Sequence, residues 1–379
     1  MATTVYKFPY FCDKMRVKDA KEAKMAIQKF IVSRDESVYE AWPDLIKTKS
    51  GKLICVFTEC EHHICRKRSR IVLTESLDRG RTWSKKRPIS EESNQDFFFD
   101  NARLSQLSDG RITMICNRHG SESAGGAVQY LWFSEDEGTT WSAPTVLPFC
   151  GIVPDRFTEI KNGDHKGRYI VLAHYTSKET GKLEEYLWYS DDKGKTWSDR
   201  VTVAADPRYN LCEACVIECD DGALVAFMRE NSFEGYDVMK AISRDSGESW
   251  EGVYRTPITA GHRPTVGYLN DGRVMVTYRY VTCYTPLEGS VSLGLHNTFL
   301  TILKAEELTR TERAGTYFKT MPLDYDRNEK PDTGYTGWVQ FDDGEIYVVN
   351  YIKDDADKAQ IRGYSFYPSD IILYERYTK

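Results

Sequence analysis

Short runs of alternating or aromatic apolar residues recur along the chain, and each is followed by a turn that contains Asp and Gly. SRIVLTES, AVQYLWFS and EEYLWYS are three such runs. Their composition and period of two are typical of β-strands that are buried on one face. The pattern predicts a protein built from short strands, with a turn after each run.

Four of these turns share the form S-x-D-x-G-x-[TS]-W, at Ser76–Trp83, Ser134–Trp141, Ser190–Trp197 and Ser243–Trp250. Asp can accept hydrogen bonds from backbone N–H groups ahead of it, and Gly supplies a positive φ. Trp provides a large apolar body that can wedge between neighbouring sheets. The repeated phrase therefore indicates structural turns at the periphery of the fold, away from any site.

A second repeat places a Gly turn before a β-rich run, and it occurs six times at intervals of roughly 50 to 70 residues. The six glycines are Gly51, Gly110, Gly167, Gly222, Gly272 and Gly344. Several follow Asp, and Asp-Gly between two strands is a strong hairpin signal. Such a period suits one four-stranded sheet, so the chain is predicted to be an all-β, six-bladed β-propeller of four-stranded antiparallel blades.

The propeller is expected to form a single domain over residues 28–379, preceded by an N-terminal extension over residues 1–27. The strand that closes the ring is expected from KFIVSRD, residues 29–35, or from SDIILYERY, residues 369–377.

Composition narrows the class of protein. The chain has 379 residues, 41% hydrophobic and 13% aromatic, which is enough for a large core. It has no long apolar run and no apolar segment near its first residue, so we expect a cytoplasmic protein without a membrane span. The ten cysteines lack a framework spacing and are expected to be reduced, with no metal and no cofactor. The net charge of −6 gives no support for nucleic-acid binding.

Blade geometry predicts where a site would lie. The first strand of each blade lines the centre, so residues about nine before the hairpin Gly and seven after it should surround one mouth. The first set is Trp42, Asn101, Glu213, Arg263 and Tyr335, with the third-blade equivalent near Asp155 and Arg156. The second set is Thr58, Asn117, His174, Arg229, Arg279 and Tyr351. Asp44 and Arg103 lie two residues nearer the hairpin.

Histidines are concentrated at this mouth, where we place His62, His63, His119, His174 and His262. Unpaired charges on crowded inner strands are costly. The charged residues therefore form either a binding and catalytic site or a buried group whose charges pair only with one another, for example Glu213 with Arg229.

The four turns resemble the Asp box of the sialidase (neuraminidase) superfamily, and CEACVIECDDGALVAFMRE resembles the sialidase segment that carries a Glu and an Arg around a hairpin. The resemblance implies that Tyr335 is a nucleophile, that Glu213 activates it, and that Arg229 and Arg263 bind a substrate carboxylate.

Two features depart from the family pattern. Ala41-Trp42-Pro43 stands where sialidases have Arg-Ile-Pro, so the first clamp arginine is absent. The loop ECEHHICRKRSR lacks the expected acid/base Asp, which leaves Glu61, His62 or His63 as the proton donor. The missing positive charge could come from Arg34, Arg66, Arg103 or Arg156.

The sequence thus predicts a sialidase-like, exo-acting glycoside hydrolase that releases a terminal anionic sugar by a retaining Tyr/Glu mechanism. Two alternatives stay open: a uronate-type carbohydrate lyase that uses His, Tyr and Arg, and a non-catalytic glycan-binding propeller. In each case the partner is a carbohydrate. The predicted binding residues are Arg229, Arg263, His262, Arg103, Asp44, Trp42, Arg156, His174 and Tyr351.

Overall fold

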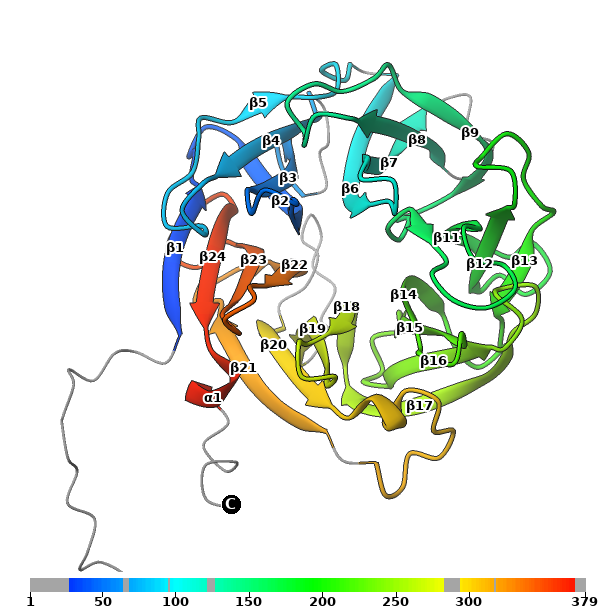
Figure 1. The fold of residues 1–379 in the computed structure, drawn as a ribbon. Helices are drawn as coiled ribbons and strands as arrows, with labels where there is room; N and C mark the ends of the chain where they lie inside the picture. Colours follow the sequence, from blue (N-terminus) through cyan, green and yellow to red (C-terminus); the bar gives the residue numbers. More distant parts are fainter. Residues whose placement is uncertain are drawn as a thin grey trace, which may run out of the picture.

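The computed structural model describes residues 27–63, 68–94, 96–120, 127–282, 294–316 and 318–371. Within these ranges the chain forms six four-stranded antiparallel sheets. The sheets are arranged as blades around a central axis (Figure 1). The predicted fold class, an all-β six-bladed propeller, is confirmed.

The first five blades are simple meanders whose strands run in chain order from the axis outward (Figure 1). The first three blades consist of β2 (Tyr39–Lys47), β3 (Leu53–Cys60), β4 (Arg70–Ser76) and β5 (Arg87–Pro88); β6 (Phe97–Gln106), β7 (Ile112–Gly120), β8 (Ala127–Ser134) and β9 (Thr145–Gly151); and β10 (Thr158–Glu159), β11 (Tyr169–Thr176), β12 (Leu183–Ser190) and β13 (Val201–Ala204). The fourth and fifth consist of β14 (Leu211–Glu218), β15 (Leu224–Glu230), β16 (Asp237–Ser243) and β17 (Glu251–Thr259); and β18 (Gly261–Tyr268), β19 (Val274–Val281), β20 (His296–Leu303) and β21 (Lys319–Tyr325).

The sixth blade joins the two ends of the described chain. It contains β22 (Thr333–Gln340), β23 (Ile346–Ile352) and β24 (Gln360–Phe366), and its outer strand is β1 (Gln28–Ser33), which pairs antiparallel with β24. Of the two segments proposed to close the ring, the first is therefore the one that does so (Figure 1). The second contains part of the short helix α1 (Pro368–Ile371), and its residues 372–377 lie outside the described residues.

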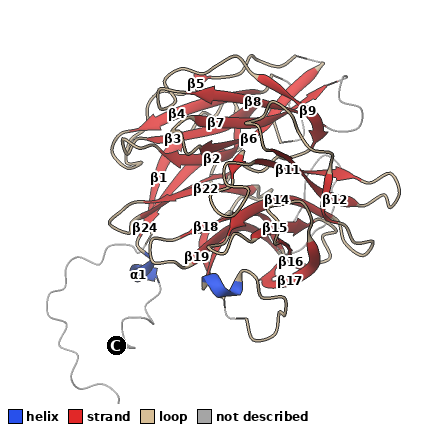
Figure 2. Cartoon of the chain, turned by 45° about the vertical axis from the view of Figure 1, so that its right-hand side comes forward, coloured by secondary structure: helices blue, strands red, loops and turns tan. Residues whose placement is uncertain are grey.

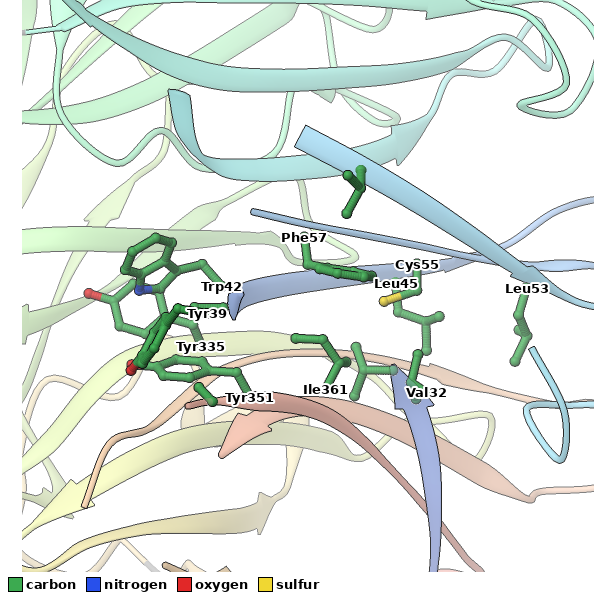
Figure 3. Packing of buried hydrophobic residues seen from close by; sticks show 14 of the residues in the cluster. Val32, Tyr39, Trp42, Leu45, Leu53, Cys55, Phe57, Tyr335, Tyr351 and Ile361 are labelled. Atoms are coloured by element: carbon green, nitrogen blue, oxygen red, sulfur yellow. The ribbon is translucent and has the colours of Figure 1, made fainter. Parts of the chain in front are cut away.

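The core lies between the blades, and Figure 2 shows the sheets stacked face to face around the ring. One cluster joins the first and sixth blades through Leu45, Leu53, Phe57 and Ile361, with Val32 of β1 beside them (Figure 3). Central strands such as β3, β15 and β23 are buried along their whole length, and apolar burial between neighbouring sheets stabilises the ring by about 25 cal/mol per Å².

The four repeated turns act as predicted from their residues. In each, the Ser hydroxyl donates to the Asp Oδ1 over 2.8 or 2.9 Å, and the backbone N–H four residues beyond the Asp donates to the same oxygen. The Trp ring then packs toward a neighbouring blade. Trp83, for example, lies 6.1 Å from Tyr347 of the sixth blade.

Two further observations concern the class of protein. The cysteines in the described ranges are free of disulfides, and six of these seven are buried. Among the described residues, no helix has the length and apolar character needed to cross a membrane.

Candidate active site

The innermost strand of a blade carries a bulge at the position that the sequence pattern singled out. In β2, β6, β14, β18 and β22 the pairing register shifts within the strand. The residues at the shift, all with φ between 50° and 58°, are Trp42, Asn101, Glu213, Arg263 and Tyr335. A non-Gly residue with positive φ is uncommon and costs about 1 kcal/mol or more. Five such residues at one depth show that the fold holds these side chains in a fixed orientation.

The third blade corrects one prediction. Its residue of the same backbone type is Val153, with φ 52°, and not Asp155 or Arg156. The reason is that the innermost pairing is short here: β10 has two residues, and Ile152 bridges to His174 before it. Asp155 instead lies two residues beyond the bulge, as Asp44 does in the first blade, and it accepts a hydrogen bond from the Val216 N–H.

Residues seven after each hairpin Gly lie opposite the residue just before the bulge. Arg229 pairs with Cys212, Arg279 with His262, and Tyr351 with Gly334. The two predicted rings therefore meet at one mouth. Gly334 allows close contact there, since a Cβ on it would lie 2.6 Å from the Cβ of Arg279.

Tyr335, Glu213 and Arg229 form a connected buried group from the sixth and fourth blades. The Tyr335 hydroxyl donates to Oε1 of Glu213, and Nη1 of Arg229 donates to the same oxygen over 3.0 Å. All three residues are at most 6% exposed. The expected contact between Tyr335 and Glu213 is present, and so is the Glu213–Arg229 pair that the alternative of self-paired charges would contain. The catalytic and binding roles of the three residues stay predictions.

This arrangement fixes the protonation states of the pair. Burial would raise the pKa of Glu213, but the Arg229 charge and the Tyr335 hydrogen bond outweigh it and lower that pKa to about 2. Burial and the nearby Glu213 carboxylate raise the pKa of Tyr335 above its ordinary value. The resting site thus holds an ionised carboxylate that accepts a hydrogen bond from a neutral phenol.

Arg263 and Arg279 differ in the hydrogen-bond partners of their guanidinium groups. Arg263 donates to the backbone carbonyls of Glu213, Ala214 and Pro154 and is 1% exposed. Arg279 lies over the Tyr335 ring at 5.4 Å and has only long contacts of 3.3 to 3.5 Å to its nearest acceptors. The binding role predicted for Arg263 stays a prediction, and Arg279 is a further guanidinium at the same mouth.

A second charged group surrounds Asp44, which is fully buried. Arg156 binds its two carboxylate oxygens over 2.7 and 3.2 Å, and Arg103 lies 3.6 Å away. Burial and the neighbouring Arg263 charge lower the pKa of Arg103 to about 10. The charges of these side chains partly neutralise one another, as expected if the charged residues at the mouth pair among themselves.

The loop after β3 reaches the first and sixth blades. Nδ1 of His63 lies 2.5 Å from Oδ2 of Asp332, and the Trp42 and His63 rings meet edge to face at 5.2 Å. His62 lies beside Tyr39, with ring centroids 5.6 Å apart. Glu61 and His62 are exposed, whereas His63 is partly buried. In Figure 3, Tyr39, Trp42, Tyr335 and Tyr351 lie together at one end of the buried cluster that joins the first and sixth blades.

The remaining predicted residues fall into three groups. His174 and His262 lie at the mouth, where Nδ1 of His174 accepts a long hydrogen bond from the Glu213 N–H, and burial lowers the pKa of both imidazoles. Arg34 forms ion pairs with Glu36 and Asp355 on the surface and does not replace the missing clamp arginine. Arg66 lies outside the described residues.

Sequence reasoning missed Asp332 and His296. Asp332 stands immediately before β22, three residues from Tyr335, so its place at the end of an inner strand was a usable signal. His296 begins β20, is 1% exposed, and interacts electrostatically with Arg279 and Asp332. Nothing in its local sequence indicated this position.

Six blades, Asp-box turns and a polar mouth define an Asp-box propeller. The model of the BNR repeat-like domain family matches residues 100–348, more than half of the chain, and the chain belongs to this family. Two curated relatives are the anhydrosialidase of Macrobdella decora, 31% identical over 31% of this chain and 16% of its own length, and a sialidase of Bacteroides fragilis, 24% identical over 57% and 44%. The chain therefore spans less than half the length of either relative. The predicted membership of the sialidase superfamily is confirmed.

Among solved structures, a Dyadobacter fermentans protein of unknown function is similar over 90% of this chain and 98% of its own. The TM-score is 0.70 and the identity is 25%.

Proposed function

We propose that this protein is a sialidase-like, exo-acting glycoside hydrolase that releases a terminal anionic sugar. The observation that carries the proposal is the buried group in which Tyr335 and Arg229 both donate hydrogen bonds to one oxygen of Glu213. Sialidase-named relatives in the same family support this class of reaction.

In the proposed reaction, the Tyr335 oxygen attacks the anomeric carbon while its proton passes to Glu213. A phenol with a raised pKa is a poor nucleophile alone, so a carboxylate in hydrogen-bond contact is required. A tyrosine suits an anionic sugar, because a carboxylate nucleophile would be repelled by the substrate's own carboxylate. The leaving oxygen takes a proton from the loop of Glu61, His62 and His63. Water then cleaves the Tyr335–sugar bond, and Glu213 returns its proton to the phenolate oxygen.

Arg229 links substrate binding to the base. In the resting site its charge lowers the basicity of Glu213. A substrate carboxylate that binds Arg229 would compete for the guanidinium, and so would make Glu213 a stronger base. Arg279, whose guanidinium lies beside the Tyr335 ring, is placed to supply a second positive charge to that carboxylate.

Covalent trapping tests this proposal. A 2,3-difluorinated sialic acid should add one sugar to the wild-type protein, detected by intact mass, with the label on Tyr335 after peptide mapping. Tyr335→Phe should keep the melting temperature, remain unlabelled and lose turnover of an aryl sialoside by orders of magnitude. Full turnover by Tyr335→Phe would reject the tyrosine mechanism.

One observation favours a second candidate, a uronate-type lyase. His262 lies at the mouth beside Arg279, and burial and the Arg229 charge lower the pKa of its imidazole well below the ordinary value, so the ring is in the neutral form that a base requires, although its basicity is reduced. A lyase would leave an unsaturated sugar that absorbs ultraviolet light, whereas a hydrolase would not. Binding to a glycan array without turnover of any kind would instead support the non-catalytic propeller.

A further inference from the structure

Asp332 is a carboxylate on which four side chains converge, from three blades. The Tyr351 hydroxyl donates to its Oδ1 over 2.8 Å, and Nη1 of Arg279 lies 3.8 Å from the same oxygen. The Tyr39 hydroxyl and Nδ1 of His63 both contact Oδ2. The residue is 5% exposed, so these contacts replace water around it.

The carboxylate of Asp332 is ionised in this setting. Burial would raise its pKa, but His63, Arg279 and His296 together hold that pKa well below the ordinary value. A fixed negative charge at 2.5 Å from Nδ1 favours a proton on that nitrogen and sets the orientation of the imidazole ring.

Of the three proton-donor candidates in the loop, His63 is the least exposed, and its Nδ1 contacts the Asp332 carboxylate. Its ring lies edge to face with Trp42 and with Tyr39, and its side chain keeps 16% exposure. Glu61 and His62 are exposed. Partial desolvation, together with the charges of His63 and Lys353, lowers the pKa of His62, so less of its imidazole is protonated near neutral pH.

We propose that His63 is the catalytic proton donor of this site and that Asp332 is its positioning residue; this rests on the proposed function. With Nδ1 held by Asp332, the proton leaves from Nε2. It passes to the glycosidic oxygen as the bond from that oxygen to the anomeric carbon breaks and the bond to Tyr335 forms. The neutral imidazole then takes a proton from the water that cleaves the intermediate, which restores the imidazolium.

This assignment explains both departures from the family pattern together. Ala41 stands at the position of the absent clamp arginine, and the next residue, Trp42, packs against His63. An imidazolium is both an acid and a cation. It therefore replaces the missing acid and contributes positive charge near an anionic substrate, which the expected carboxylic acid could not do.

Substrates with different leaving groups test the donor. His63→Ala should lower kcat/KM for an alkyl-linked sialoside by about 10²- to 10⁴-fold but should lower it far less for an activated aryl sialoside, because a good leaving group needs no acid. His62→Ala should not discriminate between the two substrates. His165→Ala, in the exposed hairpin of the third blade, is the matched control. Equal losses on both substrates for His63→Ala, or discrimination by His62→Ala instead, would overturn the assignment.

The pH profile tests the positioning role. Among the described residues, the titratable and charged groups near His63 include Asp332, Tyr39, His62 and His296, with Arg279 beyond Asp332. Asp332→Asn removes the charge that stabilises the imidazolium, so the alkaline limb of kcat/KM should move to lower pH. The Asp-box variant Asp192→Asn should leave that limb in place. A lower melting temperature with an unmoved limb would show that Asp332 is structural only.

Two results separate this inference from the proposed function. If Tyr335→Phe retains turnover, the proposed mechanism fails whatever His63 does. The His63–Asp332 pair can be measured without turnover: wild-type protein should show a downfield Nδ1–H proton resonance that both His63→Ala and Asp332→Asn remove. Absence of that resonance in the wild type would overturn the pair itself.

Discussion

The outer turns and the inner bulges share a backbone conformation with positive φ, but the residue types are constant in the turns and varied in the bulges. In the four Asp-box turns, the residue after the Asp has φ between 52° and 61°, and the Ser, Asp and Gly around it are the same each time. In the inner ring, φ lies between 50° and 58° at six positions, yet the side chains are Trp, Asn, Val, Glu, Arg and Tyr. A shared backbone with constant side chains marks a structural role. A shared backbone with different side chains marks positions that the fold presents for chemistry.

The energetics of the two regions differ in the same way. Each Asp-box carboxylate is satisfied by donors from its own turn, so its contacts are local. Several inner polar atoms have no hydrogen-bond partner among the described residues, including Oε2 of Glu213 and Nε of Arg229. Buried polar atoms without partners are costly, which is expected where a ligand completes the set.

The largest expected effect comes from removing the inner carboxylate charge. Glu213→Gln keeps the shape of the side chain but cannot accept the Tyr335 proton, so kcat should fall by about 10²- to 10⁴-fold. Glu137→Gln, at an outer turn where the carboxylate accepts hydrogen bonds from Ser50 and Thr48, is the matched control. Steady-state rates on an aryl sialoside measure both. Equal rates for the two variants would remove the distinction between the regions.

Arg263 lies in the inner ring, but its guanidinium has the contacts of a structural residue, since it donates to three backbone carbonyls. Arg263→Ala should lower the free energy of unfolding by about 3 kcal/mol, because it leaves three buried carbonyls without their charged donor. Urea denaturation checks this value. If Arg263→Ala instead keeps wild-type stability and raises KM for an anionic substrate, the side chain acts as the clamp arginine that the sequence suggested.

The sequence was sufficient for the architecture because the structural features are periodic. Gly hairpins and Asp boxes recur at the spacing of a blade, so their positions determine six sheets and the residues at the mouth. The third blade was misplaced by two residues, since its innermost pairing is interrupted and a count from Gly167 does not reach Val153.

The missing parts of the site are not periodic. Asp332 lies outside both counted rings, and its partners come from segments almost 300 residues apart, such as Tyr39. The hydrogen bonds from Arg263 to three backbone carbonyls likewise depend on how closely neighbouring blades approach one another. The Arg263 contacts have no local signature in a single sequence, and for Asp332 the sequence shows its place before an inner strand but not its partners.

A smaller effect is expected at the periphery. Asp245 accepts hydrogen bonds from the Ser243 hydroxyl, the Ser249 N–H and the Ser249 hydroxyl. Asp245→Ala should lower the free energy of unfolding by about 1 to 2 kcal/mol and leave kcat and KM unchanged. Chemical denaturation and steady-state kinetics on the same preparation test this. A changed KM would mean that the outer turns are coupled to the mouth.

The smallest effect concerns the charge of an outer turn. The Thr196 N–H and hydroxyl hold the pKa of Asp192 at about 2, below its ordinary value of 3.8. A carboxyl group whose pKa is lower in the folded state stabilises the fold above its unfolded pKa, and that contribution is lost as the pH falls through the folded value. Wild-type stability should therefore decline between about pH 4 and pH 2.

Asp192→Asn keeps an oxygen acceptor but cannot titrate, so its urea midpoint should decline less over this window. The activity profile should be the same in both proteins, because the hydrogen bonds of the Asp192 carboxylate lie within its own turn. A parallel decline in the two urea midpoints would show that acid sensitivity arises elsewhere, with the buried inner carboxylates as the next group to substitute.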